Sequence, residues 1–273
     1  MPLHQVAVFN PFPFAIGQRI HIAGGPRGGD WQVIGLSERK VQLKCPVSGR
    51  EVEWDRFCYL AETHEQEWPM PHATPITTIL FDYGGVLAEE GFTLGLSVIA
   101  KDNALDPADF FHTATEAIYS CGYVTGTGNE HEYWQLLRSQ TGIKDDDQTL
   151  TETILSRFTL RPKMLAAVHT LKKQGLNPVI LSDQTDWLDR LNQRQPFFHA
   201  FSQVFNSYHL GKTKREPSLF TDILSILGIK PQQALFVDDN QGHIDRATAL
   251  GLETHLFQNE DLFFADLARR GLV

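Results

Sequence analysis

The feature that most constrains the fold is a set of three short apolar runs, each followed at once by acidic or polar residues. Apolar, β-branched runs of this length predict buried strands. Helical patterns separate the runs, so we expect a parallel sheet with right-handed helical crossovers. Ligands bind at the carboxyl ends of such strands. The runs and the residues that follow them are 76–81 with Asp82, 178–181 with Ser182 and Asp183, and 234–237 with Asp238 and Asp239.

The first run also specifies a sharp turn. Two glycines, Gly84 and Gly85, come directly after Asp82 and Tyr83, which is typical of a chain that reverses at the end of a strand. An aspartate in this place either caps the turn or takes part in chemistry. The run by itself leaves both readings open.

The part of the chain before this sheet has a different pattern. Residues 1–72 contain short alternating runs separated by glycine and proline turns, which predicts a small all-β barrel, broadly SH3-like or Tudor-like. The stretch 68–75 has three prolines, which continue neither a strand nor a helix, and we place the domain boundary there. The second domain is then 73–273. Within it, 73–90 and 160–273 form the predicted core, and 91–159 forms an all-helical insertion.

Composition argues against several classes of function. The net charge is −9, from 24 basic and 33 acidic residues, so nucleic-acid binding and membrane-surface binding are not expected. The apolar runs are shorter than the roughly 18 residues that span a bilayer, and the start of the chain lacks a signal-peptide pattern. Cys45, Cys58 and Cys121 form no CxxC pair, so we expect buried free thiols in a cytoplasmic protein.

The polar residues after the strands form a chemically coherent set. Clustered carboxylates hold a hard cation such as Mg²⁺ through oxygen ligands, and the cation lets a phosphate approach an acid. A serine hydroxyl and a lysine ammonium, here Ser182 and Lys214, suit phosphate oxygens. An aspartate such as Asp82 can then form an aspartyl-phosphate.

Four motifs in this order resemble those of the haloacid dehalogenase-like (HAD) hydrolase superfamily, and the resemblance covers residues 76–273. The helical insertion is similar to the cap that covers the substrate in that family. The motifs are Phe81-Asp82-Tyr83-Gly84-Gly85-Val86-Leu87, Leu181-Ser182-Asp183, Lys214-Arg215-Glu216-Pro217-Ser218-Leu219-Phe220, and Phe236-Val237-Asp238-Asp239-Asn240.

The resemblance implies a role for each matched residue. Asp82 would be the nucleophile and a metal ligand, and the carbonyl of Gly84 would also bind the metal. The acids of the fourth motif would complete the Mg²⁺ site. The phosphate-binding residues would come from the second and third motifs. These further residues are Asp238 and Asp239 for the metal, and Ser182, Asp183 and Lys214 for the phosphate.

The chain departs from the family at Gly84, where phosphatases usually carry the aspartate that serves as general acid and base. His243, Glu89 and His209 are possible replacements. The favoured function is hydrolysis of a small phosphate ester with Mg²⁺. A catalytically weak or inactive binding or regulatory protein is the alternative. A 2-haloacid dehalogenase is less favoured, because that class typically has tyrosine at the position of Gly84 and lacks the paired metal acids.

Two expectations concern the parts around the site. The β-barrel would contact a peptide, a neighbouring domain or a second protomer. The helical insertion carries several polar aromatic residues, which at helical spacing we expect mainly in its core. These residues are Tyr119, Tyr123, His131, Tyr133 and Trp134.

Overall fold

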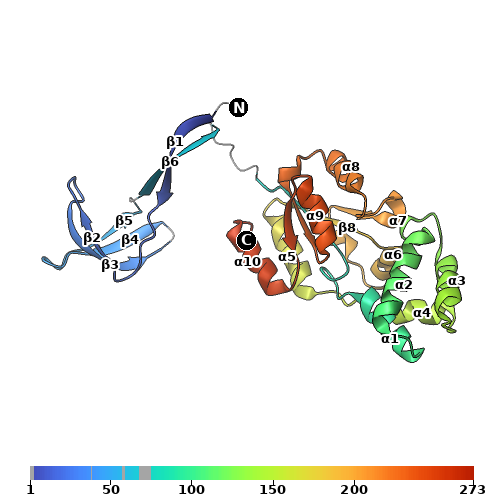
Figure 1. Ribbon diagram of the computed structural model, residues 1–273. Coiled ribbons are helices and arrows are strands. Elements are labelled where there is room, and N and C mark those ends of the chain that lie inside the picture. The colour runs from blue at the N-terminus through green and yellow to red at the C-terminus, as the bar shows by residue number, and fades with distance from the viewer. Residues whose placement is uncertain (1–2, 38, 57–58, 68–74) are drawn as a thin grey trace. The chain divides into compact units, whose positions relative to one another are not determined.

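The computed structural model describes residues 3–37, 39–56, 59–67 and 75–273 (Figure 1). Contacts between Cα atoms divide the chain into two units, Met1–Ala73 and Thr74–Val273, and each is described by itself. The predicted linker lies outside the described residues except at its last position, Pro75, and so does Cys58. Cys45 and Cys121 are free thiols, and both are half-buried rather than buried as expected.

The first unit consists of antiparallel strands. Four of them form one sheet in the order β2-β3-β4-β5, and β1 pairs with β6 in a separate ribbon. In β4 the side chains of Val41 and Leu43 are buried while their neighbours are exposed, which confirms the predicted alternation. The strands are compatible with a small barrel-like domain, and its SH3-like form stays a prediction. The bounds are β1 Leu3–Pro11, β2 Arg19–Ile22, β3 Gly29–Leu36, β4 Lys40–Lys44, β5 Glu51–Asp55 and β6 Tyr59–Glu67.

The second unit contains a five-stranded sheet in the order β11-β10-β7-β8-β9, in which every pair of neighbours is parallel. The predicted α/β class is therefore confirmed. The strand that precedes Asp82 is central, and the strands that end at Ser182 and Asp238 flank it. The bounds are β7 Thr78–Phe81, β8 Asn177–Ser182, β9 Gln203–Asn206, β10 Ala234–Asp238 and β11 Glu253–Leu256.

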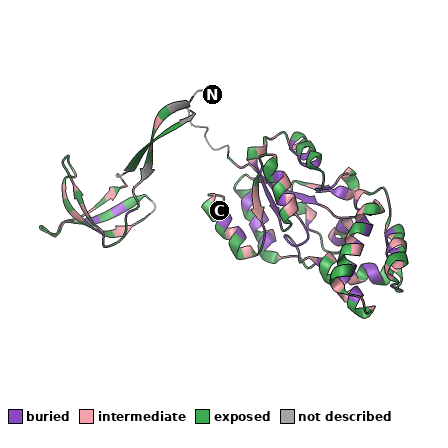
Figure 2. Cartoon of the chain, viewed as in Figure 1, coloured by how far each residue is buried: buried purple, intermediate pink, exposed green. Residues whose placement is uncertain are grey.

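Helices cover both faces of this sheet (Figure 1). Ile79 and Phe81 of β7 pack on one face with α5, α6 and α10, whereas Leu80 packs on the other face with α8 and α9. This alternation follows from the two-residue period of a strand. The residues of β7, β8 and β10 are nearly all buried (Figure 2). The bounds are α5 Pro162–Lys173, α6 Trp187–Arg194, α7 Ser207–Leu210, α8 Pro217–Leu227, α9 Gln241–Ala249 and α10 Glu260–Arg269.

The segment between β7 and α5 is helical, as expected. Asp106 and Asn129 cap α2 and α3 with their side chains, and Pro107 opens α2. The helices pack through buried aromatic and aliphatic side chains that continue the core of one sheet face. No helix in the described part of the chain is both long and apolar enough to cross a bilayer. The bounds are α1 Gly91–Asp102, α2 Pro107–Ser120, α3 Glu130–Thr141 and α4 Asp147–Leu155.

Candidate active site

The ends of β7 and β10 bring three carboxylates together. The amide of Asp82 donates to the carbonyl of Val237 at 2.9 Å, which aligns the end of β7 with that of β10. Asp238 is the last residue of β10, and Asp239 follows it. One oxygen from each of Asp82, Asp238 and Asp239 lies within 4.8 Å of the others. The sheet register thus assembles the predicted acid cluster.

Lys214 lies beneath this cluster in the loop between α7 and α8. Its Nζ is 2.9 Å from Oδ1 of Asp82 and 2.6 Å from Oδ2 of Asp238, and the side chain is fully buried. Burial alone would lower the pKa of Lys214, but the carboxylates of Asp238 and Asp82 outweigh it and raise the pKa above its usual range. The ammonium therefore stays charged and links the two acids.

The partners of Asp238 keep it ionised. Burial would raise its pKa, but the Lys214 ammonium and the His243 ring outweigh burial and hold the pKa below its usual range. Nδ1 of His243 is 3.2 Å from Oδ1 of Asp238. The same oxygen accepts the backbone N–H of Asn240 at 2.8 Å. Asp238 is thus a fixed negative charge at the end of β10.

The other two acids of the cluster shift in the opposite direction. Burial raises the pKa of Asp82 well above its usual value, and the Asp238 and Asp239 charges add to this while Lys214 opposes it. Burial, with the Asp238 and Glu90 charges, raises the pKa of Asp239 to about 6. Negative charges crowd here without an equal number of cations. A divalent cation would relieve that repulsion, and the oxygen donors are the type that Mg²⁺ prefers.

The turn after Asp82 requires glycine for two reasons. Gly85 has φ +74°, and a Cβ there would lie 1.9 Å from Oδ2 of Asp239. The close approach of this backbone to Asp239 is what brings the β10 acids to the turn. Gly84 is buried, and a Cβ there would point to Oε1 of Glu90 and to the ring of Phe158, each 3.4 Å away.

Ser182 and Asp183 follow β8. Ser182 is buried and lines the same pocket as Asp82. The Asp183 carboxylate accepts the backbone N–H of Lys214 at 2.9 and 3.0 Å, and the Tyr119 hydroxyl at 3.2 Å. Asp183 therefore fixes the loop that carries Lys214 and joins it to α2.

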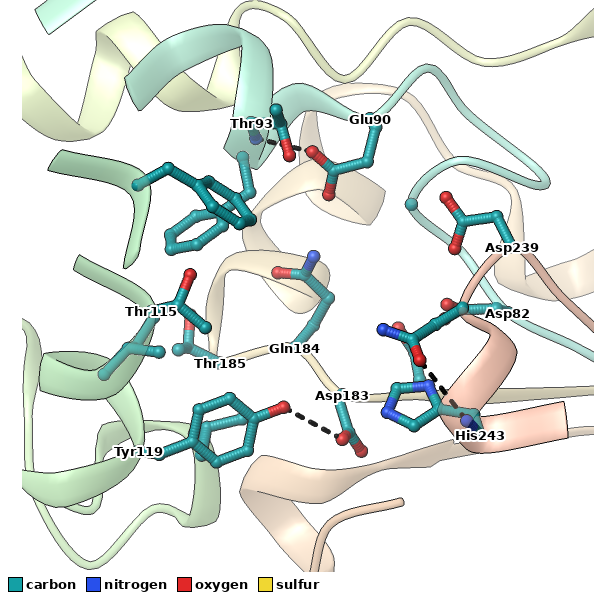
Figure 3. Close-up of a pocket in the computed structure, with 17 residues that line it drawn as sticks. Asp82, Glu90, Thr93, Thr115, Tyr119, Asp183, Gln184, Thr185, Asp239 and His243 are labelled. Atoms are coloured by element: carbon teal, nitrogen blue, oxygen red, sulfur yellow. Dashed lines mark hydrogen bonds between the residues drawn. The ribbon is translucent and has the colours of Figure 1, made fainter. Parts of the chain in front are cut away.

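A pocket of about 170 Å³ opens over Asp82 (Figure 3). One side has the polar groups of the strand ends. The other side comes from α1, α2 and the turn after α2, and includes Phe92, Phe111, Ile118 and Val124. Tyr119 is the predicted cap aromatic that lines the pocket. Tyr123, Tyr133 and Trp134 are buried in the core as expected, whereas His131 is exposed and pairs with Asp147.

The structure separates the three replacements considered for the missing acid. His243 lines the pocket, where its ring faces Asp238. Glu89 is exposed and pairs with Arg161 at 3.1 Å, away from this pocket. His209 is exposed and pairs with Asp189 at 2.7 Å, and it does not line the pocket either. Two of the three are therefore outside the site.

Sequence reasoning missed Glu90, the residue before α1. Its Oε2 accepts the backbone N–H of Thr93, so it caps the helix, and its side chain lines the pocket. Burial raises the pKa of Glu90, although the hydrogen bonds from Thr93 favour the ionised form. The available signal was weak, because glutamate is not among the preferred N-cap residues.

Comparison with known proteins identifies the same family as the sequence motifs. A family model described as haloacid dehalogenase-like hydrolase matches residues 76–251. The chain is 29% identical over 122 residues to bifunctional epoxide hydrolase 2 of Sus scrofa, which covers 42% of this chain and 22% of that protein. This chain therefore spans about a fifth of the length of that relative. It is 23% identical over 200 residues to D-ribitol-5-phosphate phosphatase of Bacteroides thetaiotaomicron, covering 68% and 93%.

Solved structures share the fold. A HAD family enzyme from Bacteroides thetaiotaomicron has a TM-score of 0.58 and 21% identity over 71% of this chain and 99% of that one. The same enzyme in complex with magnesium and inorganic phosphate has a TM-score of 0.53 and 20% identity over 69% and 99% of the two chains. L-2-haloacid dehalogenase from Xanthobacter autotrophicus has a TM-score of 0.50 and 16% identity, over 72% and 84%. At these identities the likeness shows the fold alone.

Proposed function

The chain belongs to the haloacid dehalogenase-like hydrolase family, and from that premise we propose that it is a Mg²⁺-dependent phosphatase of small phosphate monoesters, with Asp82 as nucleophile. One observation carries the proposal: the Asp82 carboxylate faces a pocket and shares a cluster with Asp238, Asp239 and the Lys214 ammonium. Phosphatase-named relatives and the magnesium- and phosphate-bound enzyme of the same fold support it.

The acid cluster fits a hard cation. We assign the metal to Asp82, Asp238 and Asp239, with the Gly84 carbonyl as a further ligand. Bound Mg²⁺ would supply the positive charge that lets a phosphate dianion approach these carboxylates. The presence of Asp238 and Asp239 in this chain favours a phosphatase over a dehalogenase, because these acids would serve a metal-dependent reaction.

We assign the chemistry as two displacements at phosphorus. An Asp82 oxygen attacks the phosphorus of the ester, the bond to the leaving oxygen breaks, and an aspartyl-phosphate forms. Water then attacks the same phosphorus and releases inorganic phosphate and the free carboxylate. Lys214 lies under the pocket against the Asp82 carboxylate rather than in the lining, and from there its ammonium, with the Ser182 hydroxyl, would hold phosphoryl oxygens. Asp183 positions the Lys214 loop through the bonds to its backbone N–H.

The pocket favours a leaving group without a second negative charge. Among the described residues that line it, none is lysine or arginine, and Glu90 and Asp183 add negative charge to that of Asp82 and Asp239. A second phosphate or a carboxylate on the substrate would therefore lack a partner cation. We expect monoesters of neutral alcohols to be hydrolysed faster than bisphosphates in a substrate panel.

The test is turnover of 4-nitrophenyl phosphate and an alkyl phosphate with Mg²⁺, compared between the natural chain and Asp82→Asn. We expect the variant to lose at least about 10³-fold in kcat, since the nucleophile is gone. Asp222→Asn is the matched control, because Asp222 pairs with Lys212 outside the pocket. Absence of turnover in the natural chain on every ester, with Mg²⁺ still bound, would contradict the proposal and favour a binding or regulatory protein.

A further inference from the structure

The Glu90 carboxylate has one oxygen engaged and one oxygen free. Oε2 accepts the backbone N–H of Thr93 at the start of α1. Within the described ranges, no residue donates a hydrogen bond to Oε1. The side chain lines the pocket over Asp82, and Figure 3 draws it around the same space as Gln184, Asp82 and Asp239. The hydrogen bond to Thr93 at the start of α1 thus fixes the Glu90 carboxylate in place, and its other oxygen is left facing the pocket.

The position of the free oxygen is set by a glycine. Because Gly84 has no side chain, Oε1 of Glu90 approaches to 3.4 Å from the point where a Cβ would be. Gly84 is the second residue after Asp82, in the turn that faces the phosphate position of the proposed reaction. The Glu90 carboxylate therefore occupies the space that a side chain at 84 would otherwise enter.

The other carboxylates of the pocket are engaged elsewhere, and His243 is held through one ring nitrogen. Asp82 and Asp239 belong to the cation cluster. Asp183 accepts hydrogen bonds that hold the loop and α2. His243 turns Nδ1 to Asp238, which holds the ring at the strand end. Glu90 is the acid among the described lining residues that retains an unengaged oxygen outside the cluster.

We propose that Glu90 is the general acid and base of the reaction, an inference that rests on the proposed phosphoryl transfer to Asp82. In the first displacement the proton on Oε1 passes to the leaving oxygen as its bond to phosphorus breaks, so an alcohol departs and Glu90 becomes a carboxylate. In the second displacement that carboxylate takes a proton from the attacking water as the bond from phosphorus to Asp82 breaks. Glu90 is then protonated again, and the cycle is balanced.

The test is the effect of Glu90→Gln on two esters. Glutamine keeps an oxygen for the Thr93 amide, so the start of α1 is retained, but it has no acidic proton. For an alkyl phosphate we expect kcat/KM, which reports the first displacement, to fall about 10²–10⁴-fold. For 4-nitrophenyl phosphate, whose leaving group is stable as an anion, kcat/KM should fall less than about tenfold. Loss of the base should also make the aspartyl-phosphate accumulate, which acid quenching would trap.

Two further variants complete the design. Glu89→Gln is the matched control, because Glu89 pairs with Arg161 outside the pocket, and both esters should be hydrolysed at the natural rate. Gly84→Asp in the Glu90→Gln background should restore part of the alkyl phosphate activity, because a carboxylate then enters the same space. The backbone permits it, since Gly84 is not among the positive-φ residues.

The outcomes separate this inference from the proposed function. An equal loss of activity on both esters in Glu90→Gln, or no loss on the alkyl ester, would overturn the role of Glu90. Hydrolysis of the esters by the natural chain would still support the proposed phosphatase activity. A natural chain that hydrolyses neither ester would overturn both. Selective loss on the alkyl ester, with a trapped aspartyl-phosphate, is the expected result.

Discussion

The two units of this chain are stabilised in different ways. Among the side chains that the structure describes, the first unit encloses a small core of four fully or nearly buried apolar residues, and its other described strand positions are exposed or half-buried. The second unit packs both faces of its sheet and, in addition, buries charges at the strand ends. The four buried residues of the first unit are Phe14, Val33, Val41 and Leu43. A small core confers little stability, whereas buried charges make the second unit sensitive to single polar changes.

The largest effect is expected for Lys214→Met in the second unit. Removing the ammonium leaves Asp82 and Asp238 as close, buried carboxylates without a cation. Breaking a buried ion pair on one side typically costs about 3–5 kcal/mol. We therefore expect the free energy of unfolding of this unit to fall by that amount in urea titrations without divalent metal, followed by circular dichroism.

The control variant tests whether the loss of stability depends on the burial of the lysine. Lys212→Met removes a lysine of the same loop whose partner, Asp222, is half-exposed, so its effect should be much smaller. Hydrogen exchange in β3 and β4 of the first unit should not change with either variant. A loss for Lys214→Met no greater than that for Lys212→Met would show that the second unit does not depend on its buried charges.

Much of this arrangement could be predicted from the sequence because it follows from local pattern. Apolar runs that end in Asp82, Ser182 and Asp238 specify buried strands, and parallel pairing then places all three ends at one edge. The caps at Asp106 and Asn129 are equally local, since each side chain bonds its own helix. The family match extends over the same residues.

The role of Glu90 could not be predicted in this way, because it depends on tertiary packing. Glu89 and Glu90 are adjacent and chemically identical, yet one pairs with Arg161 and the other enters the pocket. What separates them is the start of α1, which lies so close to Phe158 that a Cβ at Gly91 would come within 2.5 Å of its ring. Whether the first unit closes into a barrel is likewise a matter of contacts between distant strands.

A smaller effect is expected for Leu43→Ala in the first unit. Leu43 is fully buried in the four-residue core, and a leucine-to-alanine change in a core costs about 2–5 kcal/mol, with the lower values where the site can collapse. We expect about 2–3 kcal/mol here, because a thin sheet relaxes easily. Hydrogen exchange of β3, β4 and β5 should become fast, while hydrolysis of 4-nitrophenyl phosphate stays unchanged.

Val47→Ala is the matched control, because the Val47 side chain is exposed, and protection of the three strands should persist. A fall in hydrolysis that parallels the loss of hydrogen-exchange protection in Leu43→Ala would contradict the view that the two units are independent. It would mean that the first unit contributes to the activity of the second, in line with the predicted contact of the barrel with a neighbouring domain.

The smallest effect is expected at a second buried charge, Asp266 of α10. It accepts hydrogen bonds from His255 at 2.9 Å and from Arg270 at 3.0 Å, and also pairs with Arg269. Burial would raise its pKa, but these donors outweigh burial and lower the pKa. Asp266→Asn should cost about 1–3 kcal/mol at neutral pH, the usual loss for a charged hydrogen-bonded group.

The sign of the pH dependence makes this last prediction distinctive. Because the folded pKa of Asp266 is depressed, its stabilisation is fully present above the unfolded value near pH ~3.9 and is lost as the pH falls through the folded pKa. The difference in unfolding free energy between the natural chain and Asp266→Asn should therefore be constant from neutral pH to about pH 5 and shrink in more acid solution. Asp102→Asn, at an exposed site, should show no such convergence. A difference that persisted unchanged into strong acid would mean that Asp266 stabilises the unit through packing rather than charge.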